Sequence, residues 1–261
     1  MFADYHIHTN YSEDSSVNME DYIKLAIKLG YNDICFTDHI DYGTPFCYSC
    51  DTEKYLKDIT NYQEKYKDKI KIKLGMEFGA QAHHSSYFQK IFDSYPFDFI
   101  ILSFHLIHDK DLWDGSFQRG KSQAQFNREY YEEILKTVQN YNDYCVLGHL
   151  DLIRRYDSYG EYPFINSKEI IEEILHNVIN SQKGIELNTS SFRYKLNDLM
   201  PSTDILKFYK ELGGEIITIG SDCHYLNHFG FKINEMREFL KSIGYEYFCT
   251  FDKMKPSFHK L

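Results

Sequence analysis

Near its start the chain reads Tyr5-His6-Ile7-His8-Thr9-Asn10-Tyr11-Ser12. His6 and His8 are two residues apart, and alternate side chains of a β-strand point to the same face. If residues 2–8 form a strand, both imidazoles can therefore reach a single cation. One His-x-His pair is weak evidence for a metal site, so its meaning depends on the other ligands that the chain supplies.

Five later apolar stretches end in side chains of the types that bind metal ions. The stretches cover residues 34–38, 70–76, 97–104, 145–148 and 216–221. The side chains that follow them are His39, Glu77, His105, His149, Asp222 and His224. Each stretch is short enough to be a buried strand. The repetition predicts that the ends of these strands meet at one place and hold metal ions there.

Amphipathic patterns between these stretches predict helices. We expect them at Met19–Leu29, 52–68, 84–93, Gln123–Tyr141, from Ser167 to about residue 179, at Pro201–Leu212 and at about 232–242. Residues 184–188 predict a further strand, and a last short strand at 247–251 has no assigned neighbour. Seven strand–helix units in alternation are typical of a parallel sheet covered by helices.

Two parallel topologies fit this alternation, a closed barrel and an open doubly wound sheet. In a barrel all strand ends open on one mouth, whereas an open sheet binds its ligand at one switch point. Reactive groups after nearly every strand favour the barrel. No change in composition marks a linker, so we expect residues 1–261 to form a single α/β domain.

The composition limits the kinds of partner. Of the 261 residues, 43% are hydrophobic, which is enough for a sizeable core, and the formal net charge is -10. Such acidity argues against a nucleic-acid surface, where basic stripes are expected. It is compatible with a small phosphorylated substrate, because bound divalent cations reverse the local sign of the charge. No apolar run approaches the ~18 residues of a membrane span, so we expect neither nucleic acid nor a membrane as a partner.

The six cysteines are scattered along the chain, at Cys35, Cys47, Cys50, Cys145, Cys223 and Cys249. This distribution predicts reduced, buried thiols and a cytoplasmic protein. No signal peptide is visible at the start, which agrees with that expectation. The Cys47-x-x-Cys50 pair could instead form a zinc knuckle or a redox pair, although no second pair accompanies it.

Nine side chains are candidate metal ligands: His6, His8, Asp14, His39, Glu77, His105, His149, Asp222 and His224. One four- to six-coordinate ion cannot use nine protein ligands, but two or three divalent ions can. Glu77 could bridge two of them. Histidine and carboxylate without cysteine suit zinc, manganese or iron. Asp14 could also be a turn residue, and a single histidine at a strand end is often structural.

The loops after the fifth and sixth strands contain three arginines, Arg154, Arg155 and Arg193. These loops overhang the expected mouth of the barrel, and a guanidinium group binds phosphate in a bidentate manner. We therefore expect Arg193 and one of the other two to contact a phosphate. Surface ion pairs are the alternative in an acidic protein.

Other loop residues could complete a pocket. The side chains of Tyr156, Phe117 and Trp113 could line a pocket for a flat or cationic group of the substrate. Proton transfer could involve His108 or His228, which lie in loops near the expected mouth. We interpret Asp38, Asp41 and Asp151 as turn residues or as hydrogen-bond partners of the metal ligands. We interpret His83 and His84 as ordinary surface residues.

Six short motifs together resemble the polymerase-and-histidinol-phosphatase (PHP) superfamily. They are His6-x-His8-Thr9, Phe36-Thr37-Asp38-His39, Gly75-Met76-Glu77, Ser103-Phe104-His105, Gly148-His149-Leu150-Asp151 and Gly220-Ser221-Asp222-Cys223-His224. The resemblance covers almost the whole chain, in order. It implies a distorted, TIM-like (β/α)7 barrel with a trinuclear metal site.

The same resemblance implies which ligands each ion would use. The first ion would take His6, His8, Glu77 and Asp222, the second Glu77, His105 and His149, and the third Asp14, His39 and His224. Many relatives place a histidine where this chain has Asp14, so the identity of that ligand is open.

Within the superfamily, the chain resembles the monofunctional histidinol-phosphate phosphatases in its size and in its additional arginines. The implied reaction is hydrolysis of L-histidinol phosphate to L-histidinol and phosphate, in histidine biosynthesis, by a metal-bound hydroxide. Arg155 and Arg193 would grip the phosphate, with His228 as a further catalytic candidate. Arg154, Tyr156 and Phe117 would contact the substrate.

Three alternatives to this function stay open. The first is a PHP-type phosphoesterase of other specificity, such as a phosphotyrosine phosphatase or a nuclease. The second is a metal-binding module without catalytic activity. The third is an amidohydrolase-like enzyme, for which a lysine at a strand end would be expected, and none is found.

Overall fold

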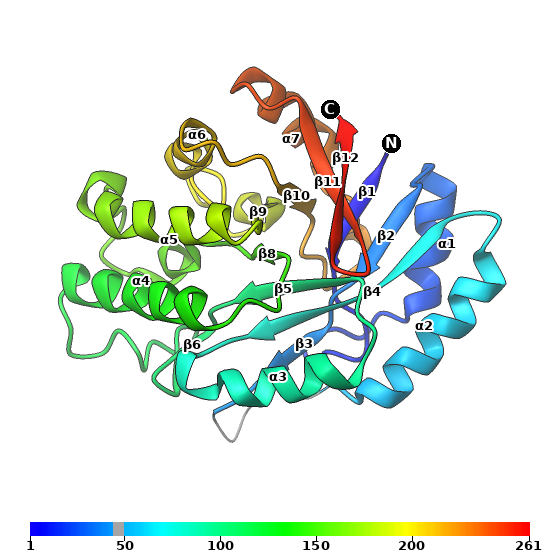
Figure 1. Ribbon diagram of the computed structural model, residues 1–261, viewed down its shortest axis with the longest axis horizontal. Coiled ribbons are helices and arrows are strands. Elements are labelled where there is room, and N and C mark those ends of the chain that lie inside the picture. Colours follow the sequence, from blue (N-terminus) through cyan, green and yellow to red (C-terminus); the bar gives the residue numbers. More distant parts are fainter. Residues whose placement is uncertain (44–49) are drawn as a thin grey trace.

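The computed structural model describes residues 1–43 and 50–261 (Figure 1). Cys47 lies outside the described residues, so the interpretation of Cys47-x-x-Cys50 as a metal or redox pair is not addressed. The other five cysteines are free and buried. No helix in the described part of the chain is long and apolar enough to cross a membrane.

Parallel strands form the centre of the molecule. They are β1 (Ala3–Ile7), β2 (Asp33–Phe36), β3 (His39–Asp41), β4 (Lys71–Gly79), β5 (Phe99–Ser103), β8 (Val146–Leu147), β9 (Gly184–Asn188) and β10 (Ile217–Gly220). They pair in the order β1-β2-β4-β5-β8-β9-β10, and β3 pairs with β4 beyond the end of β2. Strands β2 and β3 thus share one of seven positions.

The sheet closes on itself between its first and last strands. A parallel bridge joins Ile7 to Cys223 just after β10, and the His8 N–H donates to the Cys223 carbonyl at 3.0 Å. Few hydrogen bonds make this seam, so the barrel is nearly closed and distorted. The predicted seven-stranded TIM-like barrel is confirmed, and the open sheet is excluded.

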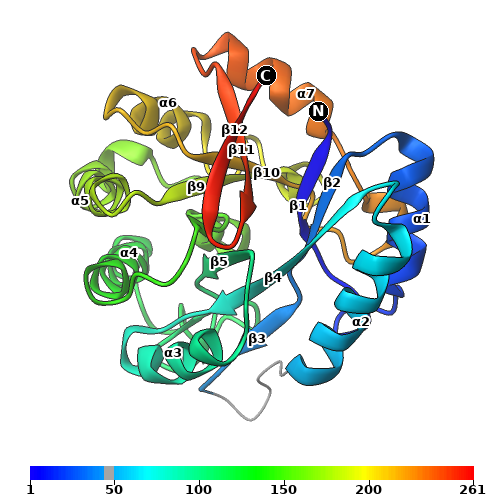
Figure 2. The same ribbon diagram turned by 45° about the vertical axis from the view of Figure 1, so that its right-hand side comes forward.

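Helices surround the strands in a ring, as Figure 2 shows. They are α1 (Met19–Leu29), α2 (Thr52–Tyr66), α3 (Ser85–Ser94), α4 (Gln123–Asn140), α5 (Lys168–Asn180), α6 (Thr203–Glu211) and α7 (Ile233–Ser242). Local signals explain several ends. Helix α1 stops at Gly30, whose φ of 79° is left-handed, and α4 starts with a capping box between Ser122 and Gln125.

An antiparallel hairpin covers the N-terminal end of the barrel. It consists of β11 (Tyr247–Asp252) and β12 (Lys255–Lys260). The Phe251 ring packs against Phe99 at 5.0 Å between centroids, and the Phe251 N–H donates to the Tyr5 hydroxyl at 3.0 Å. The predicted last strand therefore belongs to this cap rather than to the barrel. Strand β12 was not predicted, because its alternate side chains are largely exposed and give no apolar pattern.

A second hairpin lies at the opposite end, within the long loop after β5. It consists of β6 (Leu106–Ile107) and β7 (Lys110–Asp111), joined by His108 and Asp109. Both linking residues have left-handed backbones, with φ values of 52° and 58°, as a tight two-residue hairpin turn requires. This hairpin connects the strand end at His105 to the rim of the barrel mouth.

Candidate metal centre

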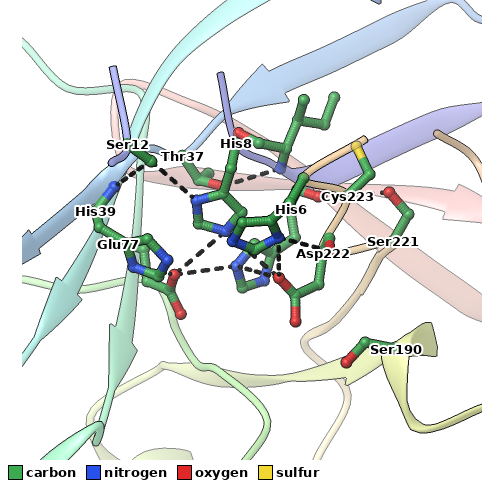
Figure 3. A network of polar contacts seen from close by, with 12 residues as sticks. His6, His8, Ser12, Thr37, His39, Glu77, Ser190, Ser221, Asp222 and Cys223 are labelled. Atoms are coloured by element: carbon green, nitrogen blue, oxygen red, sulfur yellow. Dashed lines mark hydrogen bonds and ion pairs between the residues drawn. The ribbon is translucent and has the colours of Figure 1, made fainter. Parts of the chain in front are cut away.

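The predicted metal ligands converge on Glu77, at the C-terminal half of β4. Glu77 Oε2 lies 3.2 Å from His6 Nε2, 3.4 Å from His8 Nε2 and 2.9 Å from His39 Nδ1. Figure 3 shows these imidazoles grouped around the carboxylate. The register explains the meeting of His39 and Glu77, because β3 pairs with β4 at these two residues. Residues distant in sequence thus reach one oxygen atom.

The second carboxylate oxygen of Glu77 faces two other imidazoles. Glu77 Oε1 is 2.9 Å from His149 Nε2 and 3.4 Å from His105 Nε2. These histidines follow β8 and β5, which lie beyond β4 in the barrel. The two oxygens therefore face different sets of nitrogen atoms, which is the arrangement of a carboxylate that bridges two cations.

A third group of ligands lies toward the mouth. His224 Nε2 is 2.9 Å from Asp14 Oδ2, and His39 Nε2 is 3.7 Å from the same oxygen. Asp222 Oδ1 lies 3.5 Å from His8 Nε2 and 3.5 Å from His224 Nδ1. All nine predicted ligands are thus brought to one cluster. Among the described residues, groups of three ligand atoms within 4.8 Å include His6–His8–Asp222 and His6–Glu77–His149.

The donor atoms of the cluster fit divalent cations. His6 Nε2, His8 Nε2 and Glu77 Oε2 are buried and have no hydrogen-bond partner, although buried polar atoms are normally paired. They point at one another around a shared space, and imidazole with carboxylate suits zinc, manganese or iron. Backbone strain occurs here too, since His149 and Asp222 have φ values of 22° and 53°.

The electrostatics of the cluster couple metal binding to protons. Burial lowers the pKa of His39, but the charges of Glu77 and Asp14 outweigh burial and raise the pKa to about 9. Burial and then the neighbouring imidazoles of His224 and His39 hold the pKa of His8 well below its usual range. Burial would raise the pKa of Glu77, yet the facing histidines keep it well below its usual range. Protons on some of the imidazoles thus balance the negative charge of Glu77, and an incoming cation must displace these protons.

Two buried carboxylates orient the ligand histidines from behind. Asp41 Oδ1 lies 2.8 Å from His105 Nδ1, and Glu186 Oε1 lies 2.6 Å from His6 Nδ1. A carboxylate on the far ring nitrogen fixes the tautomer and orientation of a metal-binding histidine. Asp41 was predicted as such a partner, but Glu186 was missed. Its signal is a carboxylate at the centre of the short strand β9, between Ile185 and Leu187.

A cavity of about 360 Å³ opens over the cluster. Arg155 and Tyr156 line it, as predicted, and so does Trp113. Asp111, Tyr194 and Tyr225 line it as well but were not predicted. The Arg155 guanidinium lies 3.0 Å from the centroid of the Tyr194 ring. The aromatic ring therefore holds the charged end of Arg155 at the wall of the cavity.

Two predicted substrate contacts lie elsewhere. Arg154 donates to Asp151 Oδ2 and to the Leu199 carbonyl, each at 2.9 Å, and it lines a separate cavity of about 40 Å³. Phe117 is fully buried, with the Lys121 ammonium 3.7 Å from its ring centroid. Neither residue is among those that line the cavity over the cluster. Packing of the loops, which the sequence does not display, turns both side chains away.

Asp222 forms part of the cavity wall, and Arg193 and His228 lie behind it. Arg193 Nη2 donates to the carbonyls of Ser221 and Asp222, each at 2.7 Å, while its buried Nη1 has no partner. His228 is half-buried, and burial followed by the charge of Arg193 lowers its pKa. Neither is among the described residues that line the cavity. Their predicted contacts with the substrate remain predictions.

Comparisons with known proteins agree with this geometry. The PHP domain model matches residues 4–190. A histidinol-phosphatase of Lactococcus lactis is 37% identical over 97% of this chain and 95% of its own length. A probable histidinol-phosphatase of Clostridium acetobutylicum is 32% identical over 88% of this chain and 89% of its own.

Solved structures give the same result. The crystal structure of the Lactococcus lactis histidinol phosphate phosphatase, in complex with zinc, L-histidinol and phosphate, has a TM-score of 0.88 at 35% identity and covers 98% of each chain. A second crystal structure, of a protein from Listeria monocytogenes, shares the fold, with a TM-score of 0.75 at 18% identity, covering 89% of this chain and 99% of its own. The PHP domain match covers Glu77 and the five histidines around it, and the chain belongs to the PHP domain family.

Proposed function

We propose that this protein is a histidinol-phosphatase, which hydrolyses L-histidinol phosphate to L-histidinol and phosphate in histidine biosynthesis. The observation that carries the proposal is the Glu77 carboxylate surrounded by five imidazoles beneath a cavity with an arginine in its wall. The relative that is 37% identical is a histidinol-phosphatase. The structure that is 35% identical holds the two products of this reaction.

Three divalent ions of zinc, manganese or iron would occupy the cluster. The proposed ligands are His6, His8, Glu77 and Asp222 for the first, Glu77, His105 and His149 for the second, and Asp14, His39 and His224 for the third. Zinc is bound in the similar crystal structure. When bound, such ions lower the pKa of water toward ~7 and neutralise the charge of phosphoryl oxygens.

The arginines would position the phosphate group. Arg155 already lines the cavity, where its guanidinium group would suit bidentate recognition of a phosphate. Arg193 has an unpaired, buried Nη1 that a phosphoryl oxygen could satisfy. Both charges would stabilise the phosphoryl group as its negative charge shifts during cleavage. Tyr156 would line the substrate pocket.

The departing alcohol must take up a proton or a positive charge. His228 lies beside Arg193, and its lowered pKa leaves it neutral near pH 7. It would therefore act by orienting a proton carrier, such as water, rather than by donating its own proton from a charged ring. The structural role of His108 is different, because it faces Glu133 at 3.6 Å on the outer side of the mouth.

The proposal is tested by measuring phosphate release from L-histidinol phosphate with zinc or manganese present. The His8→Ala variant should lose this activity, because it removes an imidazole from the centre of the cluster. The control is His176→Ala, since His176 is an exposed histidine on α5, 3.8 Å from Glu172. Full activity of thoroughly metal-stripped protein would contradict the mechanism.

Other phosphoesterase activities are the second candidate, because they share the same fold and ligands. A panel of histidinol phosphate, phosphotyrosine and short DNA separates them. We expect histidinol phosphate to have the highest kcat/KM and DNA to be inert, in keeping with the net charge of -10. Bound metal without turnover of any of the three would favour a non-catalytic module.

A further inference from the structure

A second group of metal-binding side chains lies outside the proposed active site, on the outer rim of the barrel mouth. His83 and His84 end the short 3-10 helix η1 (Ala82–His84), which leads from β4 into α3. Asp109 lies in the turn between β6 and β7. In Figure 1 these elements meet at the edge of the barrel where α3 begins. From the sequence we expected the two histidines to be ordinary surface residues, because no sequence pattern links them to Asp109.

The three side chains converge on one point. His84 Nε2 lies 2.9 Å from Asp109 Oδ1, and His83 Nε2 lies 3.2 Å from both oxygens of Asp109. The two imidazole rings are 3.9 Å apart between centroids. In a tetrahedral zinc site, bonds of about 2.0–2.2 Å separate the ligand atoms by roughly 3.3–3.6 Å. Moving these atoms apart by a few tenths of an ångström would therefore make room for a shared ion.

A buried glutamine holds Asp109 in this position. Gln81 is fully buried, and its Oε1 accepts the Asp109 N–H at 2.7 Å. Its Nε2 donates to Asp109 Oδ1 at 3.0 Å and to the Tyr42 carbonyl at 3.1 Å. The Tyr42 ring meets His84 edge-on, with centroids 4.8 Å apart. The carboxylate and one imidazole are thus oriented before any ion arrives, as partners behind metal ligands usually ensure.

A second clamp ties the two elements together. Glu133 of α4 is 2% exposed. One of its oxygens accepts the Ala82 N–H at 2.7 Å, at the start of η1. The other lies 3.6 Å from His108 Nε2, in the turn that carries Asp109. Because Gln81 and Glu133 join η1 to the turn independently, the cluster is preorganised rather than a chance meeting of mobile side chains.

We propose that His83, His84 and Asp109 bind one further divalent transition-metal ion of the zinc type, separate from the cluster around Glu77. Two imidazoles and one carboxylate favour zinc over magnesium or calcium, which prefer all-oxygen sites. The side chains of His83 and Asp109 are 39% and 43% exposed, so water can supply the remaining ligands. A bound ion would fasten the β6–β7 hairpin, and with it Asp111 in the cavity wall, to the start of α3.

Metal stoichiometry of the holoprotein tests the proposal independently of the proposed reaction. Protein with its central cluster loaded is dialysed against micromolar zinc with excess magnesium, and bound zinc is counted. The wild type should hold one zinc ion more per chain than the His83→Ala/His84→Ala double variant. The Asp109→Asn variant should also bind this ion more weakly, which guards against a folding defect in the double variant. His176→Ala is the matched control and should keep the wild-type stoichiometry, because it removes an exposed histidine that faces a single carboxylate.

Cobalt provides a second readout, since its visible spectrum reports the ligand set. Titration with cobalt of protein in which zinc fills only the central cluster should give one spectral component in the wild type and in His176→Ala that the double variant lacks. Equal zinc counts in the wild type and the double variant would overturn the proposal. Displacement of the additional zinc ion by excess magnesium would also overturn it, since that behaviour indicates a loose carboxylate site.

Discussion

The two ends of the barrel treat buried polar groups in opposite ways, although neighbouring residues of β1 serve both. At the N-terminal end, the Tyr5 hydroxyl accepts the Phe251 N–H at 3.0 Å and lies 3.1 Å from Asp33 Oδ1. At the C-terminal end, His6 Nε2 and His8 Nε2 are buried without a hydrogen-bond partner. The polar groups around Tyr5 are paired by the protein itself, whereas the imidazoles of His6 and His8 are completed only by something that binds to them.

This difference separates stability from function along the same strands. A closed hydrogen-bond network under the β11–β12 hairpin contributes to folding free energy, because its members are paired when the protein folds. The cluster around Glu77 concentrates charges and unpaired donors, which cost free energy in the absence of cations. Barrel enzymes in general keep stabilising residues at the N-terminal face and reactive residues at the C-terminal face.

The largest effect is expected at the end that needs cations. Glu77→Gln keeps the size of the side chain but removes the charge that faces five imidazoles. We expect kcat for histidinol phosphate to fall by about 1,000-fold or more, equal to ~4 kcal/mol of transition-state stabilisation. Phosphate release together with the number of bound ions measures this effect, and both should fall.

Tyr5→Phe is the matched change at the other end. It should lower the free energy of unfolding by about 1–2 kcal/mol, since buried partners lose a hydrogen bond, while kcat stays within twofold of the wild type. Urea unfolding and the phosphate assay give the two numbers. If Tyr5→Phe impaired turnover as strongly as Glu77→Gln, the separation between the two ends would be wrong.

A second prediction uses the pH dependence of stability at the N-terminal end. Burial raises the pKa of Asp33 from 3.8 to about 7, with partial opposition from Lys73. The folded protein therefore binds a proton that the unfolded chain releases above pH 3.8. The stability from this proton is fully present below that value and is lost as the pH rises toward 7. At 1.36 kcal/mol per pKa unit the loss is at most ~4 kcal/mol.

Asp33→Asn should remove this dependence. The change in unfolding free energy between pH 4.5 and pH 8, measured by urea titration at fixed metal concentration, should be smaller in the variant than in the wild type. Taking the difference between the two proteins cancels the titration of the metal cluster, which they share. Equal changes in both proteins would mean that Asp33 is already charged at low pH.

A smaller effect on turnover than that of Glu77→Gln is expected behind the cluster, at a residue that acts through a ligand rather than as one. Glu186→Gln should weaken metal binding by about 10–100-fold, because the group that orients His6 loses its charge. Excess zinc or manganese should restore most of kcat, which distinguishes a positioning residue from a ligand. Glu77→Gln provides the contrast, since its kcat should stay low at any metal concentration. If kcat of Glu186→Gln depended on metal concentration as it does in the wild type, His6 would need no carboxylate behind it.

Much of the architecture could be read from local patterns. The predicted helices are present with ends within about two residues, and the predicted strand ends carry the ligands that meet at Glu77. These predictions succeed because helical and strand periodicities are local, and because parallel strands of a barrel must end at the same mouth. The hairpin of β11 and β12 was missed since its outer strand is mostly exposed and has no apolar alternation.

Loop side chains behaved differently. The neighbours Arg154 and Arg155 are equivalent in the sequence, yet one pairs with Asp151 and the other lines the cavity. Phe117 is buried under Lys121 rather than exposed to substrate. The direction of such a side chain depends on partners that are distant in sequence, so no pattern within the loop could reveal it.

The sequence by itself therefore determined the alternation of strands and helices and the nine residues available as ligands, because both follow from spacing along the chain. The tertiary structure alone decided which nitrogen faces which oxygen of Glu77, that Glu186 stands behind His6, and that His83 and His84 meet Asp109. These contacts join segments from different strands and loops, and their geometry exists only once the barrel has closed.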